Sequence, residues 1–271
     1  MSDVSGINGA GRTELAKIIR QSGATITVPE AAAVLHLPRL QTAQRMARWA
    51  KQGWLTRVRR GLYLPVPLQA RAAEDVVEDP WVIAARLFEP CYISGWSAAE
   101  HWGLTEQIFR TVVVITTRSI SQRKLKIQST EFWVKRVIAR RMFGTKTVWR
   151  GKTPVRVADP AKTLVDMLDD PAIAGGARAM EDALKAYLAS TSKDTERLLD
   201  YAKRMRNGAV LKRLGYLLER ADRSDRVLLD NMRSHLTWGN AKLDPALPSE
   251  RLITRWRLWV AAVGKEQTAH D

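Results

Sequence analysis

The chain has little cysteine, no long apolar run and, over two long stretches, almost no acid. Cys91 is the only cysteine among 271 residues, so no disulfide can form within the chain and we expect a buried structural thiol. No apolar run approaches the roughly 20 residues that a bilayer-spanning helix needs. The opening residues, MSDVSGINGAGR, lack the charged-then-apolar order of a signal peptide. These absences predict a cytoplasmic protein without a membrane partner.

Acidic residues are missing where basic residues gather. Between Ala31 and Ala73 there are eight arginines or lysines and no acid, and between Gln107 and Ala158 there are thirteen against the single acid Glu131. The formal net charge is +16. Such a charge predicts a polyanionic partner, which charge alone does not identify as DNA, RNA or a membrane surface. The hydrophobic content of 45% is enough for the cores of two domains.

The first acid-free stretch has the pattern of a winged helix-turn-helix. The segment His36-Leu37-Pro38 breaks one helix before another begins, and Gly61 provides the turn of a basic hairpin. Helices are expected at about 12–22, 28–35 and 38–54, and hairpin strands at 55–58 and 62–64. Their order predicts a DNA-binding domain over residues 1–70.

The long helix should turn one face to the core and another to DNA. At about 100° per residue, Leu40, Ala43, Met46, Ala47 and Ala50 share one arc, which we assign to the core. The polar side has no acid, and it mixes phosphate-binding cations with side chains that can read base edges. A merely solvated helix face is the alternative. The predicted DNA contacts on helix and wing are Arg39, Gln41, Thr42, Gln44, Arg45, Arg48, Lys51, Gln52, Arg57, Arg59 and Arg60.

The rest of the chain predicts a linker at 71–79 and an α+β domain at 80–271 with a helical C-terminal part. Ser97 and Glu100 fit a capping box, and Gly103 should end that helix. Strands of a mixed sheet are expected at 111–117, 132–138 and 153–157. Further helices are expected at about 80–88, 160–168, 177–188, 195–205, 209–220 and 225–236.

Four segments of this second part have distinctive motifs. They are YISGWSAAEHWGLTEQ at 92–107, DPAKTLVDML at 159–168, GAVLKRLGYLLE at 208–219, and residues 243–256, where LDP precedes RW. Together with the N-terminal pattern, they resemble the AbiEi family of antitoxins from bacterial abortive-infection, type IV toxin-antitoxin systems. The resemblance covers nearly the whole chain.

The resemblance implies a phage-defence repressor that binds inverted repeats of double-stranded DNA in its own promoter. A dimer or two cooperating monomers could bind such repeats, so a monomer or a weak dimer is expected. It also implies an antitoxin domain that counters an AbiEii-type nucleotidyltransferase toxin without requiring a stable complex. No catalytic activity and no cofactor are implied. In the second domain the motif residues are interpreted as fold determinants, namely Ser94, Trp96, His101, Leu104 and Thr105.

The second basic stretch predicts a further nucleic-acid or toxin-related surface, because it has almost no acid over some fifty residues. A solvated basic face of a basic protein is the alternative. The residues assigned to this surface are Arg123, Lys124, Lys126, Lys135, Arg136, Arg140 and Arg141.

The sequence does not predict an enzyme or a metal site. The carboxylates Asp166, Asp169 and Asp170 straddle a helix end instead of gathering around a scissile phosphate. No pair of histidines has the helical spacing of metal ligands among His36, His101, His235 and His270. Two other functions remain as alternatives: a ligand-responsive winged-helix regulator, and an RNA-binding protein that uses the basic second domain.

Overall fold

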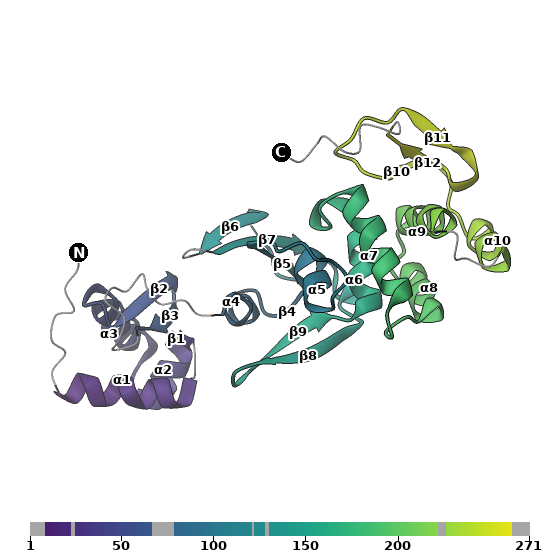
Figure 1. Cartoon of the computed structure of the whole chain (residues 1–271). Helices are drawn as coiled ribbons and strands as arrows, with labels where there is room; N and C mark the ends of the chain where they lie inside the picture. The colour runs from purple at the N-terminus through teal and green to yellow at the C-terminus, as the bar shows by residue number, and fades with distance from the viewer. Residues whose placement is uncertain are drawn as a thin grey trace.

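The computed structural model describes residues 9–22, 25–66, 79–120, 122–127, 130–221 and 226–261. In these residues an N-terminal unit precedes a six-stranded sheet, a group of helices and a small C-terminal sheet (Figure 1). The expected mixture of helices and strands is confirmed.

The N-terminal unit, residues 9–66, joins three helices to an antiparallel sheet of order β1-β3-β2. The β2–β3 hairpin turns at Gly61, whose φ of 82° is the left-handed conformation that glycine adopts without strain. The elements of the unit are α1 Gly9–Ser22, β1 Ile26–Thr27, α2 Val28–Leu35, α3 Arg39–Lys51, β2 Leu55–Arg59 and β3 Leu62–Pro65.

Local sequence sets the limits of α2. The Thr27 hydroxyl accepts a hydrogen bond from the backbone N–H of Glu30 at 3.3 Å, and the Glu30 carboxylate accepts one from the backbone N–H of Thr27 at 2.9 Å. This reciprocal capping box begins the helix. His36, at φ 53°, ends it, and Pro38 precedes α3. The predicted tight break between the two helices is therefore confirmed.

The central sheet is mixed, with strand order β6-β7-β5-β4-β9-β8. The pairs β5–β7 and β4–β9 are parallel and the other pairs antiparallel, so β6 and β8 form the two edges. The strands are β4 Cys91–Ile93, β5 Thr111–Thr116, β6 Lys124–Ile127, β7 Thr130–Arg136, β8 Thr145–Arg150 and β9 Thr153–Ala158.

Helices cover both faces of this sheet. Successive strand residues point to opposite faces. Phe132 contacts Phe88 at the end of α4 (Pro80–Leu87), whereas Trp133 contacts Trp96 of α5 (Gly95–His101). On the α5 side, α5 packs against α6 (Pro160–Asp169). The sheet is therefore the middle layer between α4 and the α5–α6 pair.

The C-terminal helices pack on α6 and are followed by a three-stranded sheet of order β10-β12-β11. In α9 the Trp256 ring occupies the space that a side chain at Gly215 would fill, so only glycine allows this contact. The elements are α7 Ala177–Ala189, α8 Thr195–Arg204, α9 Gly208–Arg220, α10 Arg226–Ser234, β10 Ala241–Lys242, β11 Arg251–Ile253 and β12 Leu258–Val260.

Strand β3 contributes to two hydrophobic cores. Tyr63 packs in the N-terminal core with Met46, whereas Leu62 and Leu64, on the opposite face of the strand, belong to the core that contains Trp81 of α4. An ion pair reinforces this junction: Arg86 of α4 donates to the α2 capping residue Glu30 at 3.0 Å. The N-terminal unit is therefore packed onto α4.

Most of the expected helices are confirmed, but the predicted capping box at Ser97 is wrong. The helix begins at Gly95 after Ser94, which places Ser97 inside it. The Ser97 hydroxyl accepts from the backbone N–H of Val113 at 3.0 Å and so ties α5 to β5. Strands β4, β6 and β8 were missed, because they are short or lie at sheet edges. The predicted buried thiol is confirmed for Cys91, and burial raises its pKa to about 12.

Candidate nucleic-acid interface

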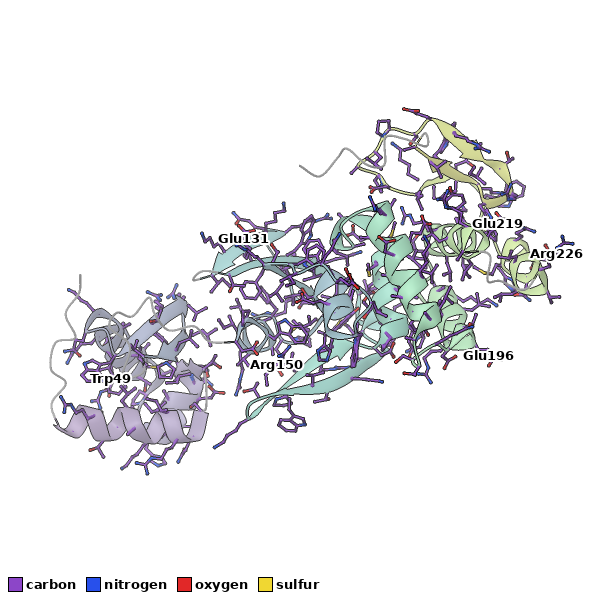
Figure 2. The ribbon with its side chains drawn as sticks, viewed as in Figure 1. Trp49, Glu131, Arg150, Glu196, Glu219 and Arg226 are labelled. Carbon is purple, nitrogen blue, oxygen red and sulfur yellow. The ribbon has the colours of Figure 1, made fainter. Side chains whose placement is uncertain are left out.

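The helix α3 buries one narrow face and exposes the rest. Thr42, Met46 and Trp49 are buried, and Trp49, labelled in Figure 2, lies inside the N-terminal unit. On the opposite side Leu40 is 72% exposed, and Gln44 is also exposed. The outward face of α3 is therefore exposed to solvent from the first helical turn onward.

The core face predicted for this helix is wrong by about a quarter of a turn, taking about 100° per residue. Leu40 and Ala47 were assigned to the core, and both are exposed. Thr42 was assigned to DNA, but it is fully buried, and its hydroxyl donates to the carbonyl of Pro38 at 3.1 Å. The buried tryptophan Trp49 determines which way the helix faces.

Arg45 also differs from the prediction. Its guanidinium donates to the carboxylate of Glu14 in α1 at 2.5 Å, and both side chains are about a third exposed. Arg45 therefore turns toward α1 and away from the open face of α3. Gln52, at the end of the helix, is half-buried.

The open face of α3 borders a groove beside the β2–β3 hairpin. The groove has a volume of about 530 Å³. On its helix side lie Leu40 and Gln44, and on its hairpin side Arg57 and Arg60. The other residues that line it are Val28, Arg39, Ala43, Ala47, Gly61 and Tyr63. Of the predicted DNA contacts, the structure thus brings Arg39, Gln44, Arg57 and Arg60 together. Arg59 lies on β2, and its side chain is outside the described part of the structure.

The cations that flank this groove have no acidic partner within the described ranges. Glu14 pairs with Arg45, and Glu30 pairs with Arg86. Gln41, Arg48 and Lys51 continue the exposed face along α3. The groove and the helix face together therefore form a basic surface that suits a polyanion.

Comparison with known proteins finds a family that is similar to the region carrying this surface. Residues 14–66 match the family described as transcriptional regulator, AbiEi antitoxin. The resemblance seen in the sequence is thereby confirmed over the AbiEi-matching region, which runs from α1 to the end of the hairpin. No curated protein matches the chain.

A solved structure extends the likeness in fold beyond the AbiEi-matching region. The crystal structure of RV2827C protein from Mycobacterium tuberculosis is similar over 96% of this chain and 94% of that chain, with a TM-score of 0.62 and 14% sequence identity. At this identity the likeness concerns the fold alone. None of the helices in the described part of the chain is long and apolar enough to cross a membrane.

The second basic stretch lies outside the AbiEi-matching region. Some of its basic side chains form ion pairs within the protein, and others are exposed. Lys135 and Arg141 both pair with Asp169 at the end of α6, at 2.7 and 3.3 Å. Burial would raise the pKa of Asp169, but Lys135, the amide of Asn207 and Arg141 together hold it below its ordinary value. Placing Lys135 and Arg141 on an open basic surface was therefore wrong, because Asp169 engages both. The predicted residues that remain exposed are Arg123, Lys124, Lys126, Arg136 and Arg140.

Beside the exposed residues of this stretch lies a half-buried aromatic residue, on the strand next to the sheet edge. Lys124 of β6 lies over the Trp133 ring at 4.7 Å, on the same face of the sheet as Lys126. The carboxylate of Glu131 is next to them and accepts from the Thr111 hydroxyl at 3.4 Å. A small basic and aromatic surface thus occupies the β6 edge.

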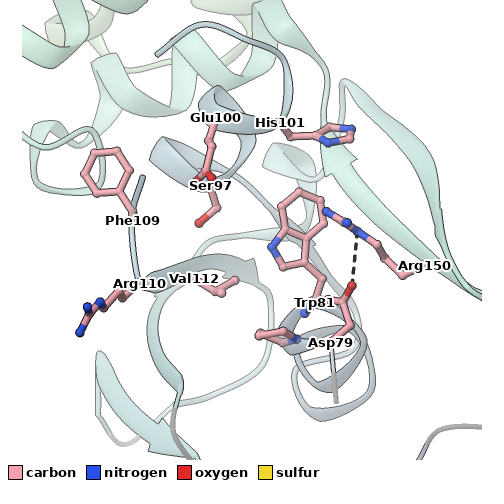
Figure 3. Close-up of a pocket in the computed structure, with 10 residues that line it drawn as sticks. Asp79, Trp81, Ser97, Glu100, His101, Phe109, Arg110, Val112 and Arg150 are labelled. Atoms are coloured by element: carbon pink, nitrogen blue, oxygen red, sulfur yellow. Dashed lines mark hydrogen bonds and ion pairs between the residues drawn. The ribbon is translucent and has the colours of Figure 1, made fainter. Parts of the chain in front are cut away.

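A separate pocket of about 690 Å³ lies where the described chain resumes after residue 66 (Figure 3). Trp81 and Phe109 line it, and Arg150 pairs with Asp79 at 3.6 Å while lying 4.2 Å from the centre of the Trp81 ring. Burial, and then the charge of Arg150, lower the pKa of His101. The guanidinium of Arg150, which lines the pocket, is therefore already engaged by groups of the protein itself.

The two motifs at 92–107 and 159–168 meet in a buried polar network. Asp166 accepts hydrogen bonds from Ser94 at 2.8 Å and from Tyr92 at 3.0 Å, and it pairs with the ammonium of Lys162. Lys162 also donates to Tyr92 at 2.9 Å. All four side chains are buried. This geometry supports the interpretation of Ser94 as a fold determinant, and it shows that Asp166 is engaged in an internal ion pair.

Proposed function

We propose that the protein is a sequence-specific DNA-binding repressor of its own operon and the antitoxin of a toxin-antitoxin pair. In this proposal residues 1–70 act as a winged helix-turn-helix, residues 71–79 as a linker and residues 80–271 as the antitoxin domain. Helix α3 enters the major groove and the β2–β3 hairpin lies along the backbone. The observation that carries the proposal is the groove between α3 and two hairpin arginines in the region that matches AbiEi regulators.

The phosphate contacts are assigned to the cations at the borders of the groove. Arg57 and Arg60 lie on the hairpin side, and Arg48 and Lys51 lie farther along α3. None of the four has an ion-pair partner among the described residues. Contacts of this kind fix the register of the protein on DNA and make binding salt-dependent.

The double variant Arg57→Ala/Arg60→Ala should bind the upstream DNA of its own gene more weakly and with a shallower salt dependence. Each lost phosphate contact reduces the slope of log affinity against log salt by about one unit. The measurement is a titration on upstream and shuffled duplexes at several salt concentrations. The charge-matched control is Arg178→Ala/Arg197→Ala, on the exposed surfaces of α7 and α8. Equal slopes for the two double variants would contradict the proposal.

The toxin partner is proposed to be an AbiEii-type nucleotidyltransferase, neutralised without a stable complex. Co-expression with the neighbouring toxin gene, from a foreign promoter, tests this role. Wild-type protein should restore growth. The Arg57→Ala/Arg60→Ala variant should restore it equally, because those residues serve DNA binding. Failure of the wild-type protein to restore growth would leave a DNA-binding regulator without antitoxin activity.

A second candidate activity is RNA binding at the β6 edge, which the Lys124–Trp133 contact favours. Lysines beside a half-buried tryptophan ring suit a single-stranded nucleic acid, since cations bind its phosphates and bases stack on aromatic faces. The variant Lys124→Ala/Lys126→Ala should reduce the salt slope of binding to single-stranded RNA by about two units, measured by fluorescence anisotropy. The control is Lys185→Ala/Lys193→Ala, in α7 and in the segment that follows it, because this variant has the same net charge. An unchanged slope would exclude this surface.

A further inference from the structure

Leu40 is an apolar side chain with no packing role in a basic helix. It is 72% exposed in the first turn of α3, while the buried side of that helix is formed by Thr42, Met46 and Trp49. Leu40 lines the groove together with Ala43 and Gln44. An exposed leucine in the middle of a polar surface contributes nothing to the core, and it is available to a ligand.

The cations of this surface lie on both sides of Leu40 and Gln44, not between them. Arg57 and Arg60 lie on the hairpin. Arg48 lies a full turn or more farther along α3. The N-terminal residues of a recognition helix are those that approach base edges in the major groove. Arg39, the first residue of α3, is exposed and lines the groove as well, and we assign it to the phosphate backbone. The residues that point outward after it in these turns are an apolar side chain and amides, Leu40, Gln41 and Gln44.

These side chains match one class of base pair. Arginine or lysine is the usual bidentate partner of guanine, whereas glutamine pairs with the N6 and N7 atoms of adenine. An apolar side chain contacts the C5-methyl group of thymine. We propose that the first turns of α3 read A·T pairs, with Leu40 against a thymine methyl group and Gln44 on an adenine. This inference rests on the proposed function and specifies the DNA that the same site selects.

The test removes single groups from the DNA and from the protein. A preferred half-site is first selected from a random duplex library with the full-length protein. Each thymine in it is then replaced by deoxyuridine, which lacks only the methyl group. Wild-type protein should lose about fourfold in affinity at one position, the worth of one buried methyl group. Leu40→Ala should bind the thymine and deoxyuridine duplexes equally well.

Gln44 is tested in the same way with 7-deazaadenine, which lacks the N7 acceptor. Wild-type protein should lose about tenfold in affinity, because the bidentate pair loses its N7 hydrogen bond, and Gln44→Ala should not respond to the change. Arg48→Ala is the matched control, because loss of a phosphate contact should weaken binding to all of these duplexes by one common factor. Circular dichroism checks that each variant is folded, as expected for exposed positions.

The outcomes separate this inference from the proposed function. A selected half-site with guanine at the contacted positions, or equal sensitivity of Leu40→Ala and wild type to deoxyuridine, overturns the A·T reading and leaves the repressor proposal intact. A wild-type protein with no preference for any duplex overturns both.

Discussion

Replacing Asp166 with alanine should destabilise the protein by about 3–5 kcal/mol, because it leaves a buried ammonium without its counter-ion. Lys162 is fully buried, and Asp166 is its only carboxylate partner among the ion pairs of the described residues. Tyr92 and Ser94 lose their common acceptor as well. Since a domain is stable by only about 5–15 kcal/mol, we expect little folded protein. Urea unfolding followed by circular dichroism measures the loss.

A double variant separates the buried charge from simple loss of packing. In Lys162→Met/Asp166→Asn both charges are removed, while the amide oxygen still accepts from Tyr92 and Ser94. Its free energy of unfolding should be much closer to that of the wild type than that of Asp166→Ala, because replacing a buried ion pair by uncharged groups of similar volume often changes stability little. In the wild-type protein, burial, followed by the charge of Asp166, raises the pKa of Tyr92 well above its usual value. Burial is kept in the double variant, so the Tyr92 hydroxyl remains a donor. A double variant as unstable as Asp166→Ala would refute the charge argument.

Asp169→Asn should cost about 2–4 kcal/mol at neutral pH and should also flatten the acid dependence of stability. Asp169 is nearly buried and pairs with Lys135 and Arg141, which are themselves about four-fifths buried. Its pKa is lower in the folded state than its ordinary value of 3.8. The stabilisation is therefore complete above that value and is lost as pH falls through the lower, folded pKa. The gap between wild type and Asp169→Asn should narrow correspondingly in urea titrations at neutral and acidic pH.

The control for this prediction is Asp182→Asn, which breaks an exposed pair with Arg178 in α7. Exposed pairs of this kind contribute about 0–1 kcal/mol, so its effect should be small at every pH. A constant gap between wild type and Asp169→Asn across the whole range would show that Asp169 acts through packing and not through its charge.

The ends of helices and the turns between elements were predictable from the sequence, because they depend on residues close to them in the chain. Pro38 and His36 separate α2 from α3, and Gly61 turns the hairpin, as the sequence indicates. Asp159 caps α6, and a proline occupies the first turn of that helix. Such signals act within a few residues, and no tertiary contact is needed to interpret them.

The direction in which α3 faces was not predictable in this way. Small residues such as Ala43 and Ala47 fit either side of a helix, so the apolar pattern gives no sharp phase. The orientation of α3 is determined by Trp49, whose large ring packs in the core, and by Glu14 of α1, which pairs with Arg45. Both effects depend on elements packed against the helix.

The prediction that the second basic stretch forms one open surface was wrong in part for a related reason. Lys135 and Arg141 are six residues apart from each other in sequence, and both meet Asp169 more than twenty residues later. A count of charges along the chain does not reveal a partner at that separation. The exposed residues Lys124 and Lys126, by contrast, lie on an edge strand, where charged side chains are common because they block pairing with other chains.

The two-sided strand β3 has a practical consequence for dissecting the molecule. A fragment cut after the hairpin would keep Tyr63 in its core but leave Leu62 and Leu64 without the α4 residues that cover them. The remaining fragment would expose the other half of the same contact around Trp81. Each fragment would expose an apolar patch, and its aggregation or non-native association would say little about the intact protein. Point substitutions in the full-length chain are therefore the sounder way to separate its activities.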